Sequence, residues 1–242
     1  MEYQRGTNIK NLDLKEYLKT KIHLPPLDVQ RRIVDVIEHI DSVIHAAADA
    51  TEKTRTARAA LLANLLNPET CTFVDSQQKA VKSDWTESTL EDIADFINGY
   101  PFKPDELGSH GKPVIRIRQL LDPQLQPDRT QIEVPERYLL KNGDLIFSWS
   151  GTLAVRIWNR GDAILNQHLF RVVEKQGHLR EWVALALDHA IGDLVTKSHG
   201  STMKHITKAT LLPHEVSTPP LEVQRQIVDV ISAVDAVTVS YT

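Results

Sequence analysis

Cysteine is almost missing from this chain of 242 residues, in which Cys71 is the only thiol. A single cysteine excludes an intrachain disulfide and a zinc site built from cysteine ligands, and it fits a reducing compartment. Long apolar runs are missing too, because none reaches the roughly 18 residues that a membrane-spanning helix needs. The N-terminal residues also lack the basic-then-apolar order of a signal peptide. We therefore expect a soluble, cytoplasmic protein.

An excess of basic charge is also absent. The chain carries 28 Lys and Arg against 32 Asp and Glu, for a formal net charge of −4, so it lacks the overall basic signature of many nucleic-acid-binding proteins. Its 41% hydrophobic and 25% charged residues are average for a globular protein and exclude a disordered or fibrous chain. Any binding of nucleic acid must therefore depend on local basic patches.

Motifs of several enzyme classes are missing. There is no G-x-G-x-x-G or Walker loop to hold a nucleotide phosphate, and no G-x-S-x-G nucleophile turn. The prolines at 25–26 and 219–220 are followed by leucine, where an amino-methyltransferase motif has an aromatic residue. The one acidic-x-Lys triplet, 13–15, is interpreted as a helix surface, and the ten histidines are scattered. We predict no catalytic and no metal site; a fused nuclease or a methyltransferase remnant is the enzymatic alternative.

A repeated segment dominates the sequence. Residues 25–37, PPLDVQRRIVDVI, recur as PPLEVQRQIVDVI at 219–231, with 11 of 13 positions identical. Further matches at the same offset of 194 residues extend the repeat over at least residues 6–43. A solenoid would repeat at a shorter period. The pattern indicates a modular chain, in which one copy of a junction stands on either side of an inserted domain.

The repeat predicts helices. Two prolines suit a first helical turn, and apolar residues then alternate at intervals of three and four positions until Asn67–Pro68. This heptad pattern is typical of a coiled coil, and polar residues such as Thr51, Thr54 and Arg58 within the seam set register or partner. We expect the two helices to pair; ordinary amphipathic helices on a globular core are the alternative. The expected pairing residues are Ile33, Ile37, Ile40, Ile44, Leu61, Leu65, Ile227, Ile231 and Val234.

Between the repeats the pattern is that of a mixed domain. Ser88–Glu91 resembles a capping box and predicts a short helix that ends at Asn98–Gly99. Alternation predicts strands at 114–118, 144–149, 153–158 and 169–173, and a helical pattern covers 180–197. The fold class is therefore α+β, one mixed α/β globular domain flanked by long helices that form coiled coils. The predicted boundaries are 1–24 for a domain tail, 25–67 for a long helix, 68–84 for a linker, 85–218 for the domain and 219–242 for the start of the second helix.

Local charge in the inserted domain differs from the average. No acidic residue lies between Val195 and His214, where three lysines are found, and arginines are the only charged residues between Asp144 and Asp162. Such patches neutralise phosphates, and polar side chains among them can read base edges. The candidates for DNA contact are Lys103, Arg116, Arg118, Gln119, Ser148, Ser150, Thr152, Asn166, Gln167, Lys197, Ser201 and Lys204. A solvated face of mixed charge is the alternative.

Several segments resemble the specificity subunit of type I restriction-modification systems, and together they span nearly the whole chain. They are the two Pro-Pro-Leu-Asp/Glu-Val-Gln-Arg helix starts, the segments Lys141–Thr152 and Asn166–Arg171, and Gly200–Thr202 before Ile206. The resemblance implies a non-catalytic DNA reader. In this family each globular target-recognition domain reads one half of a bipartite sequence, and paired helices set the spacer between the halves.

The resemblance also implies partners. Methyltransferase subunits would dock on the chain, and a restriction subunit would join them, with S-adenosylmethionine, ATP and Mg on these partners and no cofactor on this chain. The chain holds one complete recognition domain where the usual subunit holds two, so it looks like a half subunit. Two copies would then form a homodimer that reads a palindromic bipartite site. A protein-interaction scaffold and a recognition component of a type IIB or IIG restriction system are the alternatives.

Overall fold

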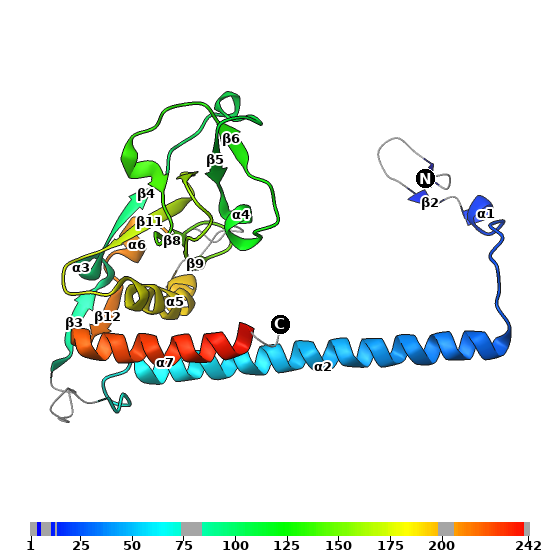
Figure 1. The fold of residues 1–242 in the computed structure, drawn as a ribbon, viewed down its shortest axis with the longest axis horizontal. Helices are drawn as coiled ribbons and strands as arrows, with labels where there is room; N and C mark the ends of the chain where they lie inside the picture. The colour runs from blue at the N-terminus through cyan, green and yellow to red at the C-terminus, as the bar shows by residue number, and fades with distance from the viewer. Residues whose placement is uncertain (1–3, 6–10, 13, 74–83, 198–205, 240–242) are drawn as a thin grey trace. The chain divides into compact units, whose positions relative to one another are not determined.

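The structure of the protein is a computed structural model, which describes residues 4–5, 11–12, 14–73, 84–197 and 206–239 (Figure 1). The chain forms two compact units, residues 1–53 and 54–242. The helices are α1 (Leu14–Tyr17), α2 (Leu27–Leu65), α3 (Leu90–Ile93), α4 (Ile117–Leu121), α5 (Arg180–Lys197), α6 (Lys208–Leu211) and α7 (Leu221–Val239), with 3-10 helices η2 (Pro104–Glu106) and η3 (Glu136–Tyr138). The strands are β1 (Gln4–Arg5), β2 (Asn11–Leu12), β3 (Thr86–Thr89), β4 (Ala94–Asn98), β5 (Lys112–Ile115), β6 (Asp128–Thr130), β7 (Leu139–Leu140), β8 (Leu145–Ser148), β9 (Ala154–Ile157), β10 (Ala163–Leu165), β11 (Leu169–Glu174) and β12 (Glu215–Thr218).

The first unit contains the N-terminal part of α2. The helix begins directly after the two prolines, and the side-chain amide of Gln30 donates a hydrogen bond to the Pro25 carbonyl at 2.7 Å. The apolar residues expected to pair with another helix lie on this part of α2 and are exposed. Ile33, Ile37, Ile40 and Ile44 are 47%, 52%, 50% and 58% exposed. The expected pairing at these four positions is therefore absent from the part of the chain that the structure describes.

The second unit is built on a four-stranded sheet of order β4-β11-β8-β9, in which all neighbours are antiparallel. Strand β11, which lies between β4 and β8, contributes to two hydrophobic clusters. Phe170 and Val172 belong to one cluster, and Leu169 belongs to the other. Because successive side chains of a strand point to opposite faces, the sheet separates the two clusters.

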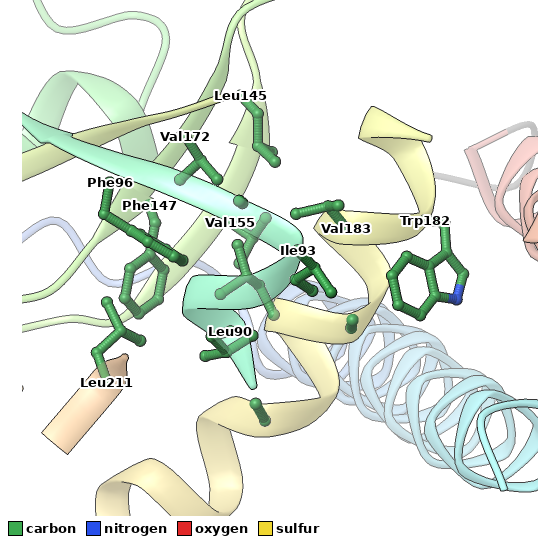
Figure 2. Close-up of a cluster of buried hydrophobic side chains, with 14 of the residues drawn as sticks. Leu90, Ile93, Phe96, Leu145, Phe147, Val155, Val172, Trp182, Val183 and Leu211 are labelled. Carbon is green, nitrogen blue, oxygen red and sulfur yellow. The ribbon is translucent and has the colours of Figure 1, made fainter. Parts of the chain in front are cut away.

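The larger cluster packs this sheet against α5 and α7. Trp182, Val183 and Leu187 of α5 are fully buried, and so are Val223 and Ile227 of α7. Figure 2 shows side chains of α3, α5 and the sheet gathered in this cluster. Burying a side chain of this size stabilises a fold by about 1.5–3 kcal/mol relative to exposure. The core of the unit therefore holds the second repeat helix onto the inserted domain.

Two further sheets complete the second unit. The sheet β6-β5-β10-β7 is mixed, since β10 pairs in parallel with β5 and antiparallel with β7. The two-stranded sheet β12-β3 joins the end of the inserted domain to its beginning, with Thr218 opposite Thr86. This pairing closes the domain and lets α7 begin three residues after β12 ends.

The second repeat helix lies in a different environment from the first. Figure 1 shows α7 antiparallel to the last turns of α2, residues 54–65, within the second unit. Ile227 is buried in the domain core, in a cluster that includes side chains of α5 and against which Leu65 of α2 packs, so its environment is wider than the two-helix seam that the sequence predicts. Ile231 is also buried, and Val234 is half-buried. In α2, Leu62 is the buried residue, whereas Leu61 and Leu65 are half-buried.

Two of the expected elements are wrong in part. The expected helix that would end at 98–99 is a single turn, α3, because the following residues 94–98 pair with β11 as strand β4. Thr89, and not Ser88, caps this turn, and its hydroxyl donates to the Asp92 carboxylate at 2.6 Å. The expected strand at 114–118 ends at Ile115, since Arg116 is the N-cap of α4. The other expected strands and the helix at 180–197 are confirmed by β8, β9, β11 and α5.

Candidate nucleic-acid interface

A groove of about 470 Å³ opens on the surface of the inserted domain. It is formed by the loop after β4, the start of α4 and the turn between β10 and β11. Its lining residues are Phe102, Arg116, Ile117, Arg118, Asn166, Gln167 and His168. Four of the residues expected to contact DNA therefore meet in one place: Arg116, Arg118 and Gln167, which are partly exposed, and Asn166, which lines the groove although it is only 5% exposed.

Backbone contacts hold two walls of the groove together. The Tyr100 N–H donates to the Leu165 carbonyl at 2.7 Å, and the Gln167 N–H donates to the Tyr100 carbonyl at 3.1 Å. Glycine is required where these segments meet, because a Cβ on Gly99 would lie 2.3 Å from the Asn166 carbonyl oxygen. The groove is therefore shaped by the main chain and does not depend on side-chain packing alone.

Two arginines of the groove share one carboxylate. Arg116 Nη1 and Arg118 Nη2 lie 3.5 and 3.7 Å from Oδ2 of Asp128. Asp128 reaches them because β6 pairs antiparallel with β5, which places Asp128 opposite Val114. The Nε of Arg116 is buried and has no hydrogen-bond partner within the described residues. Two guanidinium groups against one carboxylate leave the groove with an excess of positive charge.

His168 contributes a second polar wall. Its ring centroid lies 5.8 Å from that of Trp149, and its Nε2 lies 3.4 Å from Nε2 of Gln167. The Nδ1 of His168 is buried and has no partner in the part of the chain that is described. An imidazole beside an amide offers both donors and acceptors, which is the chemistry needed to match the edges of bases.

Three of the expected contact residues lie inside the domain. Gln119, Ser148 and Ser150 are 1%, 0% and 6% exposed. The Ser148 hydroxyl donates to the Thr152 carbonyl at 2.7 Å, and the Gln119 amide donates to the Gln126 carbonyl at 3.2 Å. The expectation that these three side chains face DNA is therefore corrected, because each is buried and the hydrogen bonds of Ser148 and Gln119 serve local turns.

The remaining candidates are separated from the groove or lie outside the described residues. Lys103 and Thr152 are exposed but do not line the groove. Ser201, Lys204 and the side chain of Lys197 lie outside the described part of the chain.

One lysine of the basic run has a structural role instead. Lys208 donates to the Phe96 carbonyl at 2.6 Å, and its Nζ lies 5.3 Å from the centre of the Phe170 ring. A cation held over an aromatic ring and on a backbone carbonyl is fixed to the domain. Its positive charge therefore stabilises the fold at this point.

Sequence reasoning missed three residues of the site. His168 lies within the segment 166–171 that carried the family resemblance, so that segment was the available signal. Phe102 follows a proline in a loop, which gives no signal of its own. Asp128 reaches the two arginines of the groove only through the pairing of β6 with β5, and no local pattern reveals such a contact.

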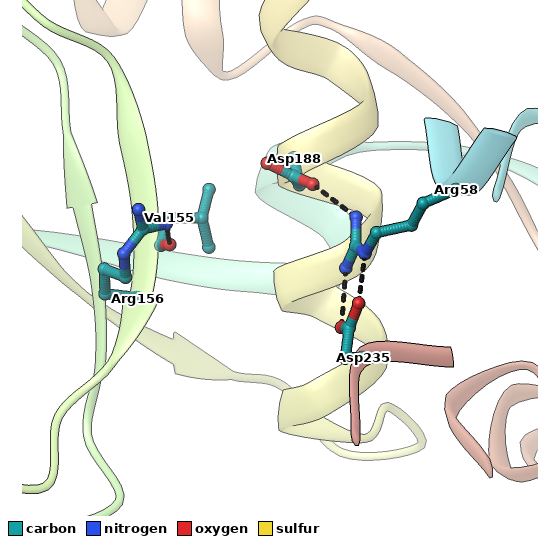
Figure 3. Close-up of polar contacts among 5 residues, drawn as sticks. All are labelled: Arg58, Val155, Arg156, Asp188 and Asp235. Atoms are coloured by element: carbon teal, nitrogen blue, oxygen red, sulfur yellow. Dashed lines mark hydrogen bonds and ion pairs between the residues drawn. The ribbon is translucent and has the colours of Figure 1, made fainter. Parts of the chain in front are cut away.

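A second polar cluster joins three helices. Arg58 of α2 contacts Asp235 of α7 with an Nη2–Oδ2 distance of 3.0 Å, and it contacts Asp188 of α5 at 3.3 Å (Figure 3). The hydrogen bond to Asp235 is the main cause that raises the pKa of Arg58 above its usual value. This cluster ties the end of α2 to the inserted domain.

The fold and the groove define a class of protein, a mixed α+β recognition domain carried on long helices. Among the residues that the structure describes, no group of three His, Cys, Asp or Glu side chains is placed to hold a metal ion. No described helix is long and apolar enough to cross a membrane.

The family model of the type I restriction modification DNA specificity domain matches residues 82–242, so the chain belongs to this family and the resemblance seen in the sequence is confirmed. The chain is 26% identical over 153 residues to the type I restriction enzyme EcoBI specificity subunit of Escherichia coli, across 62% of this chain and 32% of that subunit. It is 24% identical over 251 aligned positions to the MjaVIII specificity subunit of Methanocaldococcus jannaschii, across 96% of this chain and 59% of that subunit.

Solved structures share the fold. The HsdS subunit from Thermoanaerobacter tengcongensis matches with a TM-score of 0.58 and 22% identity, over 99% of this chain and 59% of that one. The type I S subunit from M. genitalium matches with a TM-score of 0.57 and 17% identity, over 99% of this chain and 63% of that one. The expected α+β class is confirmed, and the chain spans less than two thirds of the length of these relatives.

Proposed function

We propose that this chain is the non-catalytic DNA sequence-specificity component of a type I restriction-modification system, and that residues 85–218 read one half of a bipartite target. The groove is the observation that carries the proposal. It places Arg116 and Arg118 beside the amide of Gln167 and the imidazole of His168. Cationic groups attract the negatively charged duplex, and guanidinium, amide and imidazole groups hydrogen-bond to base edges, so both needs of a duplex reader are met in one concave surface.

Methylation and cleavage belong to partner subunits in this proposal. The related E. coli and M. jannaschii proteins are named as specificity subunits of restriction enzymes, which supports docking of methyltransferase and restriction subunits on this chain. S-adenosylmethionine, ATP and Mg²⁺ then bind to those partners, and this chain takes no cofactor. Because the substrate is cellular DNA, we place the complex in the cytoplasm.

We further propose that two copies pair through the first part of α2. Ile33, Ile37, Ile40 and Ile44 are 47–58% exposed, and their spacing of four, three and four residues is the same in both directions. An antiparallel pair therefore places Ile33 against Ile44 and Ile37 against Ile40, and a twofold axis repeats both contacts. Exposed apolar patches of this kind mark interaction surfaces. The resulting dimer would read a palindromic bipartite site.

Selection from random duplexes at moderate salt tests the DNA-reading function. The full chain is used alone and with the methyltransferase subunit of the same system. Enrichment of a short base sequence supports the DNA-reading function. Enrichment of an inverted repeat of that sequence across a fixed gap also supports the dimer. No enrichment in either condition, with circular dichroism showing a folded chain, contradicts the proposal and favours the protein-interaction scaffold. Its contact surface would be the exposed stripe on α2, formed by Ile33, Ile37, Ile40 and Ile44.

A further inference from the structure

We propose that the groove reads a guanine, that Arg118 is the residue that hydrogen-bonds to it, and that Asp128 determines this choice. The inference rests on the proposed DNA-reading function and adds the identity of one base to it. Its starting point is the single Asp128 oxygen shared by the guanidinium groups of Arg116 and Arg118.

The two ion pairs are loose enough to exchange with a ligand. Their N–O distances of 3.5 and 3.7 Å exceed the 2.7–3.2 Å of an ordinary N–H···O hydrogen bond. The side chains of Arg116, Arg118 and Asp128 are 37%, 61% and 36% exposed. Arg118 is the most exposed of the three, so its guanidinium can turn toward a base without leaving a buried carboxylate unpaired.

Arg116 has a different role. Its Nε is buried, and its backbone is the N-cap of α4, where the Leu120 N–H donates to its carbonyl at 3.0 Å. Arg116 is therefore a positioning residue that holds Asp128 through their ion pair at 3.5 Å. The Asp122 N–H donates to the Arg118 carbonyl at 2.9 Å. The main chain of Arg118 is therefore also fixed, and only its side chain needs to move to contact a base.

The carboxylate decides between phosphate and base. A phosphate bound to Arg118 would bring a negative charge close to Asp128, which is unfavourable. The major-groove edge of guanine is uncharged and presents the acceptors N7 and O6, which match the two donors of a guanidinium fork. The paired cytosine presents an N4 amine, which a carboxylate can accept. A guanidinium next to a carboxylate is therefore complementary to a G·C base pair.

Base selection with variants of Arg118 tests this assignment. We compare the full wild-type chain with Arg118→Ala, Arg118→Lys and the control Arg225→Ala, an exposed arginine of α7 outside the groove. Both substitutions of Arg118 should reduce the preference for G·C at one position of the word by about tenfold or more. Arg118→Lys should leave the salt dependence of binding unchanged, because it keeps the charge but loses the fork. Arg225→Ala should select the wild-type word.

Asp128→Asn supplies an independent measurement. Removing the carboxylate should raise the affinity for random duplexes at low salt severalfold and steepen the salt dependence, because both guanidinium groups become available to phosphates. The matched control is Asp229→Asn, an exposed residue of α7. An unchanged affinity for random duplexes in Asp128→Asn would overturn the role given to Asp128.

The possible failures are distinguishable. If Arg118→Ala and Arg118→Lys select the same base sequence as strongly as wild type does, the guanine assignment is overturned. The proposed DNA-reading function is unaffected by that result. The guanine assignment is also overturned if the two Arg118 variants lose their preference at an A·T position instead of at a G·C position. If the folded wild-type chain selects no word in either condition, the proposed function fails, and this inference fails with it. Melting curves of all variants show that a lost preference does not come from a lost fold.

Discussion

Arg58 of α2 and Asp235 of α7 lie 177 positions apart in the sequence and are joined by two hydrogen bonds, one from Nε and one from Nη2. The same guanidinium reaches Asp188 of α5 at 3.3 Å. The Arg58 side chain is only 25% exposed, so water shields the contact less than it would at an open surface. Arg58, a seam residue of α2, thus links α2 to α7 and to α5 of the inserted domain.

Loss of this contact should lower the stability of the whole domain. Arg58→Ala leaves two carboxylates close together without their cation, and we expect the free energy of unfolding to fall by about 1–2 kcal/mol. The control is Arg225→Ala on the exposed face of α7, which should change stability by no more than about 0.5 kcal/mol. Urea unfolding of the full chains measures both. Equal stabilities of the two variants would contradict a structural role for Arg58.

The internal repeat provides a matched pair of substitutions in one chain. Ile33 and Ile227 occupy the same position in the two copies, but Ile33 is 47% exposed and Ile227 is fully buried. Ile227→Ala should therefore cost about 2–5 kcal/mol, because it removes buried apolar surface and leaves a cavity. Ile33→Ala should cost less than about 0.5 kcal/mol in the same urea experiment at low protein concentration. Similar losses at both positions would contradict the difference in packing.

The same pair shows what a sequence can and cannot predict here. Helix starts after the paired prolines, the strands at β8, β9 and β11, and the helix α5 depend on local spacing, and the sequence predicts them. The burial of a helix side chain depends on which other elements pack against that face of the helix. The two copies share 11 of 13 residues, yet Val223 is fully buried and its counterpart Val29 is 36% exposed. Val223 packs in the core cluster of the second unit, which includes side chains of α5, whereas no such cluster includes Val29 among the described residues.

The candidate site was predictable to a similar extent. Charge and polarity brought attention to Arg116, Arg118 and Gln167, which line one groove. The same criteria selected Ser148, whose hydroxyl is used within its own turn. They did not select Asp128, because a search for positive charge excludes a carboxylate. The pairing of β6 with β5 is what brings Asp128 to Arg116 and Arg118.

The stability of the domain in acid should depend on Glu174. Arg180 donates two hydrogen bonds to its carboxylate, at 2.9 and 2.8 Å, and these lower the pKa of Glu174 below its ordinary value of 4.5. Such a group stabilises the fold fully above its unfolded pKa, and this stability is lost as pH falls through the lower folded pKa. Wild type should therefore exceed Glu174→Gln in stability near neutral pH, and the two should converge as pH falls below about 4.5.

Urea unfolding of both proteins between neutral and acidic pH measures this convergence. His178 also has a lowered pKa, which burial causes, but it titrates in both proteins and cancels from their difference. A stability difference that stays constant or grows in acid would show that the ion pair of Glu174 does not supply it.

The exposed stripe on α2 should determine the oligomeric state. Ile37→Asp together with Ile40→Asp puts charges at the centre of the proposed antiparallel pair, where their burial without a partner is unfavourable. We expect the mass in solution to fall from that of a dimer to that of a monomer, as measured by light scattering. The control His39→Asp with Ser42→Asp adds two carboxylates to the polar face of the same helix and should leave the dimer intact.

The antiparallel register gives a sharper test of the same surface. Two chains are prepared with Cys71→Ser, one carrying Ile33→Cys and the other Ile44→Cys, because these positions face each other in the proposed pair. Mild oxidation of their mixture should yield a disulfide-linked dimer, whereas either chain alone should yield far less, since its cysteines would lie near opposite ends of the interface. This mode of pairing would be rejected if the wild-type chain has the mass of a monomer. It would also be rejected if each cysteine variant alone forms as much crosslinked dimer as the mixture does. In either case one chain would carry one recognition domain without a partner copy.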